Sequence, residues 1–288
     1  MYLDYFIFPT IDQEHDFFMS IKHKCYDTFY PFQVLSDRGL FRLDFAPITI
    51  LYGGNGSGKS TALNVIAEKV GASRDSAFNK SNFYPNYVHL CQTPATANIP
   101  RGSRIITSDD VFDYMLNIRS LNEGIDLKRD KLFDEYMDAK FMGGEYAGFQ
   151  FKSMADYDQL AVMVKARGKT QSRYVRSELM NNIREFSNGE SAFKYFAEKI
   201  GENALYILDE PENSLSPARQ MELAGFIADS ARFYGCQFII STHSPFLLAI
   251  KGARVYDLDQ NPAAVRPWTA LENVRVYYDF FKKHGEQF

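Results

Sequence analysis

The stretch that decides the fold reads Gly53-Gly54-Asn55-Gly56-Ser57-Gly58-Lys59-Ser60-Thr61. It matches G-x-x-x-x-G-K-[ST], a glycine-rich loop whose backbone N–H groups point inward at a phosphate. The apolar run 48–52 before it predicts a buried strand, and the run 62–70 after it predicts a helix. Strand, loop and helix are the context that this motif needs. We therefore expect all nine residues to surround a nucleotide, with Lys59 at the β- and γ-phosphates and Ser60 as a ligand of Mg²⁺.

Composition and charge limit the kind of protein. The chain has 288 residues, enough for one large domain or two small ones, and 45% are hydrophobic. The net charge of −4 argues against a globally basic nucleic-acid coat, although it leaves a local basic patch open. No apolar run approaches the length that spans a bilayer, and the N-terminus lacks the layout of a signal peptide. With three cysteines and no C-x-x-C pair, we expect free thiols, a cytoplasmic location and no membrane partner.

A second apolar run ends in carboxylates. Open parallel sheets bind ligands at the carboxyl ends of their strands. The run 204–208 suits a strand buried on both faces, and Asp209 and Glu210 follow it. Asp209 suits a carboxylate associated with Mg²⁺, while Glu210 can orient and polarise a water that attacks the γ-phosphate.

A third apolar run, 237–241, precedes His243. The segment 217–234 between the second and third runs has helical periodicity and ends at Gly235, a plausible C-terminal cap. Strand, helix and strand in this order form a right-handed crossover. His243 is therefore expected near Glu210, beside the γ-phosphate.

A further strand is predicted over 87–91, and Gln92 follows it. A glutamine oxygen at such a strand end can ligate Mg²⁺ or hold the attacking water. A glutamine after a strand is also common without any function, so both interpretations stay open.

The segment Ser187-Asn188-Gly189-Glu190 precedes a helical run over 191–200. Its S-x-x-E spacing is that of a capping box at a helix start. The same physics gives a functional interpretation, because a serine and free N–H groups at a helix N-terminus form an anion site.

With Phe186, this segment resembles the L-S-G-G-Q/E signature of ABC-type ATPases, and the order of the motifs is also theirs. Within that superfamily the chain is similar to the SMC/RecF-like branch. The likeness is strongest to small standalone bacterial ATPases that carry L-D-E-P-E-x-x-L-S-P, here 208–217, and S/A-T-H-S-P, here 241–245. The resemblance covers most of 30–100 and 180–260.

The resemblance implies an α/β fold and a mode of action. The fold would be a P-loop NTPase head of ABC type, with a mixed, mostly parallel central sheet flanked by helices, an N-terminal antiparallel β part and a helical insert before the signature. ATP and Mg²⁺ would be the cofactors, with Asp209, Ser60 and Gln92 at the metal, Glu210 as catalytic base and His243 as switch histidine. An ATP-dependent head-to-tail homodimer would place Ser187, Gly189 and Glu190 at the partner's nucleotide and 213–216 across the interface.

The resemblance also has departures. Phe186 replaces the signature leucine, Asn188 replaces its first glycine, and Ser216 stands where transporter-type proteins have Asp. These departures predict slow hydrolysis rather than a loss of ATP binding.

The whole chain, 1–288, is interpreted as a single head domain with a helical subdomain at about 105–190. The segment 32–45 alternates apolar and polar residues and predicts antiparallel strands, in which Tyr30 or Phe32 either stacks on adenine or belongs to the core. The insert predicts helices from 108 and over 127–142, and it is too short for the long coiled coil of SMC proteins.

A basic cluster precedes the signature, with Tyr174 interleaved: Lys165, Arg167, Lys169, Arg173 and Arg176. It is either a nucleic-acid contact or a solvated helix face or lid.

Three functions remain in view. The first is Mg²⁺-dependent ATP binding with slow hydrolysis that drives dimerisation in DNA repair or phage defence. The second is a nucleotide-gated switch that controls a partner effector protein without binding nucleic acid. The third is the nucleotide-binding subunit of a transporter, which the missing Q-R after the signature and the Pro211-Glu212 pair disfavour.

Overall fold

The computed structural model describes residues 1–21, 25–150, 156–179 and 188–287. The chain divides into two compact units, which we call the head unit, Met1–Phe112 with Ser187–Phe288, and the helical unit, Asp113–Phe186. The head unit carries all the motifs quoted above except the basic cluster, which belongs to the helical unit.

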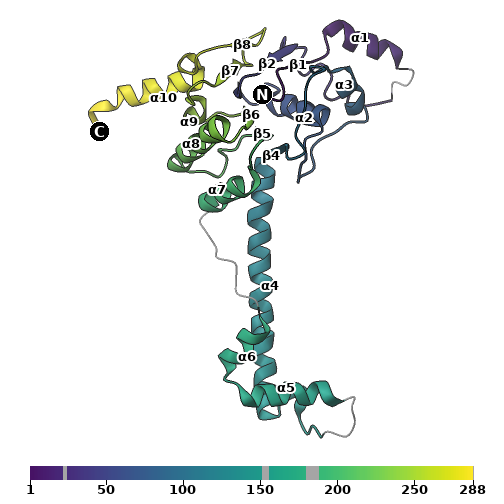
Figure 1. Cartoon of the computed structure of the whole chain (residues 1–288), viewed down its shortest axis with the longest axis vertical. Helices are drawn as coiled ribbons and strands as arrows, with labels where there is room; N and C mark the ends of the chain where they lie inside the picture. Colours follow the sequence, from purple (N-terminus) through teal and green to yellow (C-terminus); the bar gives the residue numbers. More distant parts are fainter. Residues whose placement is uncertain (22–24, 151–155, 180–187, 288) are drawn as a thin grey trace. The chain divides into compact units, whose positions relative to one another are not determined.

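The head unit is built on a central sheet (Figure 1). Its described residues form six strands in the order β4-β5-β6-β3-β7-β8. The first five in this order run parallel, and β8 is antiparallel to β7. The mixed, mostly parallel sheet is thereby confirmed. The strands are β3 (Ile48–Tyr52), β4 (Arg104–Thr107), β5 (Leu205–Asp209), β6 (Gln237–Ser241), β7 (Arg254–Asp257) and β8 (Ala264–Val265).

Helices cover both faces of this sheet, which is why its central strands are continuous apolar runs. Every residue of β3 and β6 is buried. Helix α2 (Lys59–Val70) packs on β5 and β6, and α8 (Pro217–Phe233) packs on β6. Figure 1 shows α2 and α8 on opposite sides of the sheet. The remaining helices of this unit include α7 (Asn188–Lys199), α9 (Pro245–Leu248) and α10 (Glu272–Lys283), with short 3-10 turns at Trp268–Ala270 and Gly285–Gln287.

The N-terminal part contains a two-stranded antiparallel sheet, as predicted, but the strands differ from those expected. β1 (Tyr5–Ile7) pairs with β2 (Arg42–Asp44), and residues 30–39 form turns instead of strands. Gln33 adopts a left-handed φ of 67°. Phe32 is buried and stacks on Phe17, at 4.5 Å between ring centroids, in the helix α1 (Ile11–Ser20). Of the segment 32–45, the residues up to 39 therefore form a compact apolar turn, and 42–44 form the predicted antiparallel strand.

The strand predicted over 87–91 is wrong. These residues belong to helix α3 (Tyr84–Leu90) and its C-cap Cys91. Pro85 lies in the first turn, where its fixed φ favours a helix. The buried side chains Tyr84, Tyr87 and Cys91 recur at a helical spacing of three and four. The predicted strand 87–91 leaves out Tyr84, so it contains only one repeat of this helical spacing.

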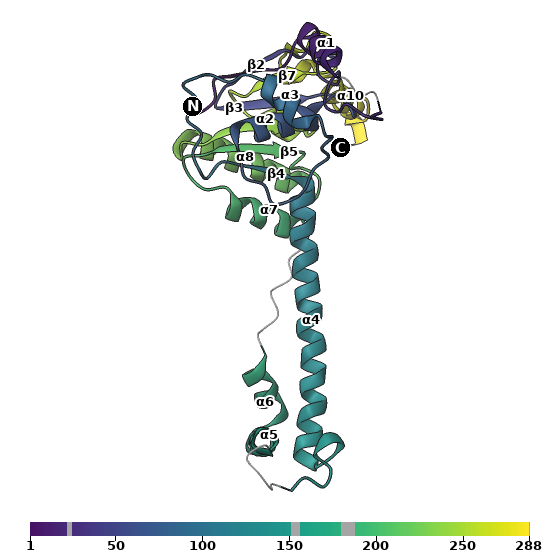
Figure 2. The same cartoon turned by 90° about the vertical axis from the view of Figure 1, so that its right-hand side faces the viewer.

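The described residues of the helical unit form the long helix α4 and the shorter helices α5 and α6, which Figure 2 labels. Helix α4 (Ser108–Phe141) begins in the head unit and runs for 34 residues without a break, about 51 Å at the α-helical rise. The separate helix predicted over 127–142 is its second half. A 3-10 turn (Gly144–Tyr146), α5 (Tyr157–Gly168) and α6 (Gln171–Glu178) follow. A small apolar core joins these elements: Leu132, Tyr136, Ala139, Tyr146, Met163, Ala166, Tyr174 and Val175.

Candidate functional site

The candidate site lies at the carboxyl edge of the parallel sheet. Asp209 is the register partner of Ser241 on β6, and Leu51 of β3 is another register partner of Ser241. The ends of β3, β5 and β6 therefore converge, as the strand-end argument predicts. A cavity of about 280 Å³ opens there, and its wall combines most of the P-loop with one carboxylate: Asn55, Gly56, Ser57, Gly58, Lys59, Ser60, Thr61 and Glu210.

The P-loop is shaped by its glycines and by its lysine. Gly58 is the N-cap of α2 with φ 91°, and a Cβ there would lie 2.9 Å from Leu35 Cδ2. A side chain at this position would be strained in conformation and in space. Lys59 is buried, and its Nζ donates to the carbonyl oxygens of Gly53 at 2.7 Å and Gly54 at 3.1 Å. Its ammonium group thus closes the loop on itself.

The carboxylates at the end of β5 partly offset the positive charge of Lys59. Burial lowers the pKa of Lys59, and the carboxylates of Glu210 and Asp209 oppose that shift. The Nζ lies 4.0 Å from Glu210 Oε1. A cation that is dehydrated and only partly neutralised favours an incoming phosphate.

Asp209 and Ser60 fit a magnesium site. Ser60 Oγ donates to Asp209 Oδ1 at 3.0 Å, and the Ser241 hydroxyl donates to the same oxygen. Burial raises the pKa of Asp209, while these two hydroxyl bonds lower it. Hydroxyl and carboxylate oxygens are ligands that Mg²⁺ prefers, with water and substrate phosphates completing its octahedron.

Glu210 and His243 face each other across the same edge. Glu210 has a left-handed φ of 48°, and its Oε1 lies 3.6 Å from His243 Nε2. Its other oxygen, Oε2, accepts from Asn213 Nδ2 at 3.0 Å. Burial lowers the pKa of His243, and the charge of Lys59 lowers it further. The pKa of the imidazole is thus lowered overall, although the charges of Glu210 and Asp259 oppose the shift, and the ring lies next to a carboxylate that lines the P-loop cavity.

Gln92 lies elsewhere. Its backbone exchanges two hydrogen bonds of 2.9 Å with Ile7 of β1, and its side chain is exposed. It is not among the residues that line the P-loop cavity. Since it follows a helix instead of a strand of the central sheet, the argument that placed it at the metal fails. On the side of β5 away from β6, the neighbouring strand is β4, whose last residue, Thr107, is the register partner of Asp209.

The signature residues lie at the start of α7. Ser187 is outside the described residues. A Cβ on Gly189 would lie 3.5 Å from the carbonyl oxygen of Ser214, and Glu190 accepts from Arg219 Nη2 at 3.3 Å. Neither Gly189 nor Glu190 lines the P-loop cavity of its own chain. They lie instead beside the turn 213–216 and α8.

Three further side chains support the site. Both carboxylate oxygens of Asp259 accept from the backbone N–H of Gly54 at 2.8 Å. Tyr30 donates its hydroxyl to Thr61 Oγ1 at 3.1 Å. Glu212 accepts hydrogen bonds from the backbone of the loop that carries His243. Asp259 follows β7, one of the two strands beside β3, so the polar residues after this further strand end could have indicated it. No sequence signal points to the Tyr30 contact.

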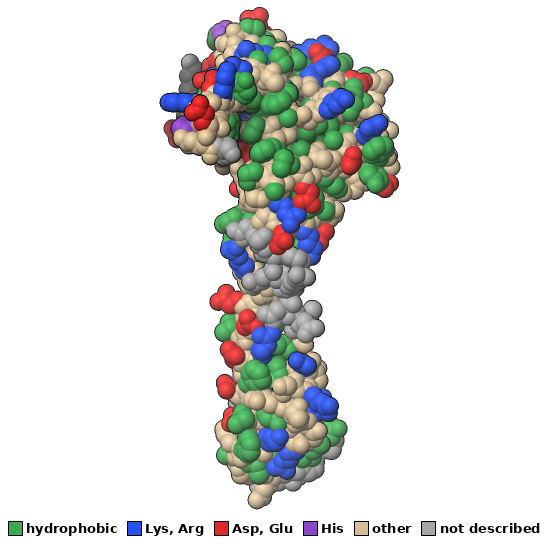
Figure 3. Space-filling view, turned by 90° about the vertical axis from the view of Figure 1, so that its left-hand side faces the viewer, with side chains coloured by type: hydrophobic (Ala, Val, Ile, Leu, Met, Phe, Trp, Pro, Cys, Tyr) green, Lys and Arg blue, Asp and Glu red, His purple; other side chains and the backbone are tan. Residues whose placement is uncertain are grey.

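The basic cluster is less available than its sequence indicates. Lys165 forms an ion pair with Glu178, and Lys169 Nζ donates to Ser177 Oγ at 3.0 Å. Tyr174 is buried and donates to Glu135 Oε1 at 2.7 Å, so it cannot stack on a base. On the part of the helical unit visible in Figure 3, acidic side chains lie along one edge, and basic side chains lie beside them toward the other edge and the far end. The exposed cations of the cluster with no described partner are Arg167, Arg173 and Arg176.

Comparison with known families gives two matches. A family model described as "ABC transporter" matches residues 41–213, and one described as an AAA domain, candidate AbiEii toxin, of a Type IV TA system matches residues 181–249. No curated protein matches the chain.

Several solved structures are similar at low identity. The Smc head domain from Pyrococcus furiosus, bound to the C-terminal domain of ScpA, is 11% identical over 84% of this chain and 95% of that one, with a TM-score of 0.37. The SMC head domain from Thermotoga maritima is 14% identical over 78% and 92%, with a TM-score of 0.33. A nucleotide-free ATP-binding cassette from an ABC transporter is 13% identical over 83% and 87%, with a TM-score of 0.37.

In the part of the chain that the structure describes, no helix has the length and apolar character needed to cross a membrane. The first family model spans more than half of the chain and contains the P-loop, Asp209 and Glu210. Glu210 lines one cavity with the P-loop, and Asp209 accepts a hydrogen bond from Ser60 of that loop. The chain belongs to the ABC transporter family and is an ATP-hydrolysing P-loop enzyme.

Proposed function

We propose that the protein binds ATP with Mg²⁺ at 53–61 and hydrolyses it slowly, and that ATP drives the pairing of two copies head to tail. The observation that carries this proposal is the convergence of Lys59, Ser60, Asp209, Glu210 and His243 at one sheet edge. These side chains come from three strand ends far apart in sequence.

Each side chain has a role that its position supports. The P-loop N–H groups and Lys59 bind the phosphates, and Ser60 and Asp209 hold the metal. Mg²⁺, when bound, neutralises charge that develops on the phosphate oxygens. Glu210 orients the attacking water and accepts its proton, since it lines the cavity and lies 3.6 Å from His243 Nε2. His243 would donate a hydrogen bond to the γ-phosphate.

The dimer proposal rests on what a single copy leaves incomplete. The start of α7 carries Gly189 and Glu190 beside the exposed turn residues Asn213, Ser214 and Ser216, away from the chain's own P-loop cavity. In a head-to-tail pair, the α7 N-terminus of one copy would face the nucleotide of the other. A helix N-terminus there would supply N–H groups and a partial positive charge to the γ-phosphate.

Substitution of Lys59 by alanine tests the ATPase. We expect wild type to hydrolyse ATP only with Mg²⁺, and Lys59→Ala to lose both nucleotide affinity and about a hundredfold or more in turnover, because a preorganised cation is removed from the phosphates. Lys251→Ala, an exposed lysine after α9, is the control and should match wild type. Equal turnover and equal nucleotide affinity in wild type and Lys59→Ala would overturn the proposal.

The process that the ATPase serves has two candidates. DNA repair or phage defence would use Arg167, Arg173 and Arg176 as a nucleic-acid contact. A nucleotide-gated switch on a partner effector protein is favoured by the second family model, whose description names a Type IV TA system, and by the burial of Tyr174. ATP-dependent DNA binding that is lost when the three arginines are neutralised would favour the first. We propose a cytoplasmic location in either case.

A further inference from the structure

We propose that Glu212 is a positioning residue for ATP hydrolysis: its carboxylate holds the loop of His243 against the turn that carries Glu210. This inference rests on the proposed function, because it concerns the geometry of the same site. It assigns a separate task to the second glutamate of the sequence Asp209-Glu210-Pro211-Glu212.

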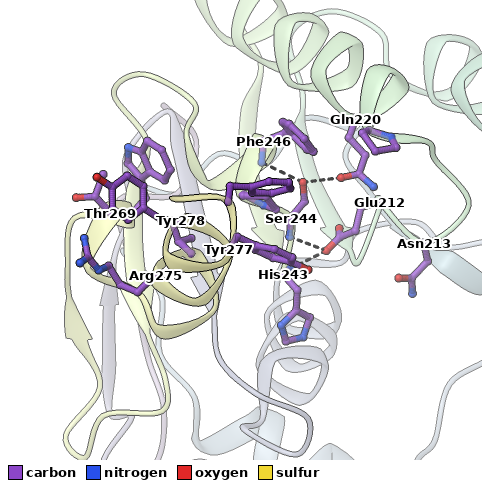
Figure 4. A pocket seen from close by; sticks show the side chains of 15 residues that line it. Glu212, Asn213, Gln220, His243, Ser244, Phe246, Thr269, Arg275, Tyr277 and Tyr278 are labelled. Atoms are coloured by element: carbon purple, nitrogen blue, oxygen red, sulfur yellow. Dashed lines mark hydrogen bonds between the residues drawn. The ribbon is translucent and has the colours of Figure 1, made fainter. Parts of the chain in front are cut away.

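Glu212 bridges the ends of two strands. It stands in the turn after β5, and its Oε1 accepts from the backbone N–H of His243 at 2.6 Å and of Ser244 at 3.2 Å (Figure 4). His243 belongs to the loop after β6, the neighbouring strand. One carboxylate oxygen thus ties together the turn that bears the base and the loop that bears the histidine. The distance of 3.6 Å between Glu210 Oε1 and His243 Nε2 depends on that tie.

His243 has few other contacts that could fix it. Among the described residues, its buried Nε2 has no hydrogen-bond partner, and its ring meets Tyr52 edge-on at 6.3 Å between centroids. Ser244 N–H has a second acceptor in Thr242 Oγ1 at 3.0 Å, whereas His243 N–H bonds Glu212. The backbone position of His243, and through it the direction of its ring, is therefore set mainly by Glu212.

The tie continues to α8 and back to the turn. Ser244 Oγ donates to Gln220 Oε1 at 2.8 Å, and Gln220 Nε2 donates to the carbonyl oxygen of Leu215 at 2.9 Å. Glu212, Gln220, Ser244 and His243 line one wall of a second cavity, of about 720 Å³ (Figure 4). The closed circuit means that a shift of the segment 213–216, in which Leu215 is buried and the other three residues are exposed, would move the histidine loop with it. In the proposed dimer, this segment is the one that meets the partner copy.

Two variants separate positioning from simple stabilisation. Glu212→Ala removes the acceptor and is expected to lower kcat for ATP about tenfold to a hundredfold, since small misplacements of reacting groups have effects of this size. KM and the affinity for ADP should stay within about twofold of wild type, because the P-loop is untouched. Glu212→Gln keeps a carbonyl oxygen at the same reach and should restore most of kcat. Glu202→Ala, an exposed glutamate before β5, is the matched control.

A histidine NMR experiment tests the tie without any turnover. The chain has five histidines, so the ring signal of His243 can be assigned by its absence in His243→Gln. Glu212→Ala should shift or broaden this signal in protein labelled at histidine, and Glu212→Gln should return it. If Glu212→Ala does not fold, Glu212→Asp, with its carboxylate drawn back by one methylene, is measured in its place and should show the same loss.

The outcomes are distinguishable. An unchanged His243 signal and unchanged kcat in the alanine or aspartate variant would overturn the inference. Equal losses in Glu212→Ala and Glu212→Gln would also overturn it, because the hydrogen-bond acceptor would then not be what matters. A wild type without ATPase activity would overturn the proposed function, while the NMR signal would still report whether Glu212 holds His243.

Discussion

At the scale of single residues, the head unit gives three buried or half-buried carboxylates different hydrogen-bond partners. Asp209 has hydroxyl donors and Glu212 has backbone N–H donors, both at the site. Glu14 on α1 is far from it in function: its Oε2 accepts from Gln33 N–H at 2.9 Å and from Ser36 Oγ at 2.8 Å. It thereby holds the turn 30–39, which is found where the sequence predicts a strand.

Glu14 leads to a prediction about pH and stability. Burial raises the pKa of Glu14 above its ordinary 4.5, more than its two hydrogen bonds lower it. A raised folded-state pKa contributes stability at low pH that is lost as pH rises through that pKa. Glu14→Gln has no such term, so its melting temperature relative to wild type should become more favourable from pH 4.5 to neutral pH. Thermal unfolding across this range measures it, with Glu202→Gln as control; a difference that does not change with pH would contradict the prediction.

At the scale of elements, the end of one helix determines where the next strand begins. Helix α8 returns the chain from β5 to β6, and its C-terminus determines where β6 starts. Gly235 follows its C-cap with φ 64°, and the N–H of Cys236 bonds back to the carbonyl oxygen of Ser230 at 3.2 Å. This left-handed turn is what the glycine in the sequence predicted.

Alanine should therefore have opposite effects on stability at Gly225, inside α8, and at Gly235, just after its C-cap. Gly235→Ala forces a Cβ to within 2.5 Å of Asn203 Oδ1 at a left-handed φ, and should lower the free energy of unfolding by about 1 kcal/mol or more. Gly225→Ala lies inside the same helix with open space around it, and should raise that free energy by about 0.5–1 kcal/mol. Urea unfolding of both variants provides the measurement. A Gly235→Ala variant as stable as wild type would show that the αL turn does not require glycine.

At the scale of the whole molecule, the head unit and the helical unit have separate hydrophobic cores. The residues that meet at the sheet edge all belong to the head unit, and Glu190 of α7 and the turn residues Asn213, Ser214 and Ser216 are exposed on that unit's surface. The state of association is therefore the property of the molecule that ATP is most expected to change.

Trapping the ATP-bound state tests that expectation. Glu210→Gln keeps the size of the side chain but removes the base, so hydrolysis should fall about a hundredfold to ten-thousandfold while ATP still binds. The variant should elute as a dimer in size-exclusion chromatography with ATP and Mg²⁺, and as a monomer without nucleotide. Adding Lys59→Ala to it should abolish the dimer. A monomer under all of these conditions would argue against head-to-tail pairing.

Much of the site follows from the order of residues alone. The P-loop was predicted from its motif, and Asp209-Glu210 and His243 from apolar runs followed by polar residues; the ends of β3, β5 and β6 lie side by side in the parallel sheet. This works because a strand buried on both faces is a continuous apolar run, and because parallel strands have their carboxyl ends at one edge. Local pattern and global position are then nearly the same information.

What only the tertiary structure decided lies where that link fails. Gln92 follows a helix whose buried face is marked by Tyr84 and Tyr87, so a short apolar run could not reveal which edge it reaches. Tyr174 has an aromatic ring that the sequence leaves free to stack, but packing places it in the core of the helical unit. The contact between Glu212 and His243 joins residues on two strand ends, and it exists only once β5 and β6 pair. The sequence by itself thus determined the chemistry of the phosphate site, because that chemistry is written in contiguous motifs. Folding decided which polar side chains brace it, because bracing depends on distances between segments that no local pattern encodes.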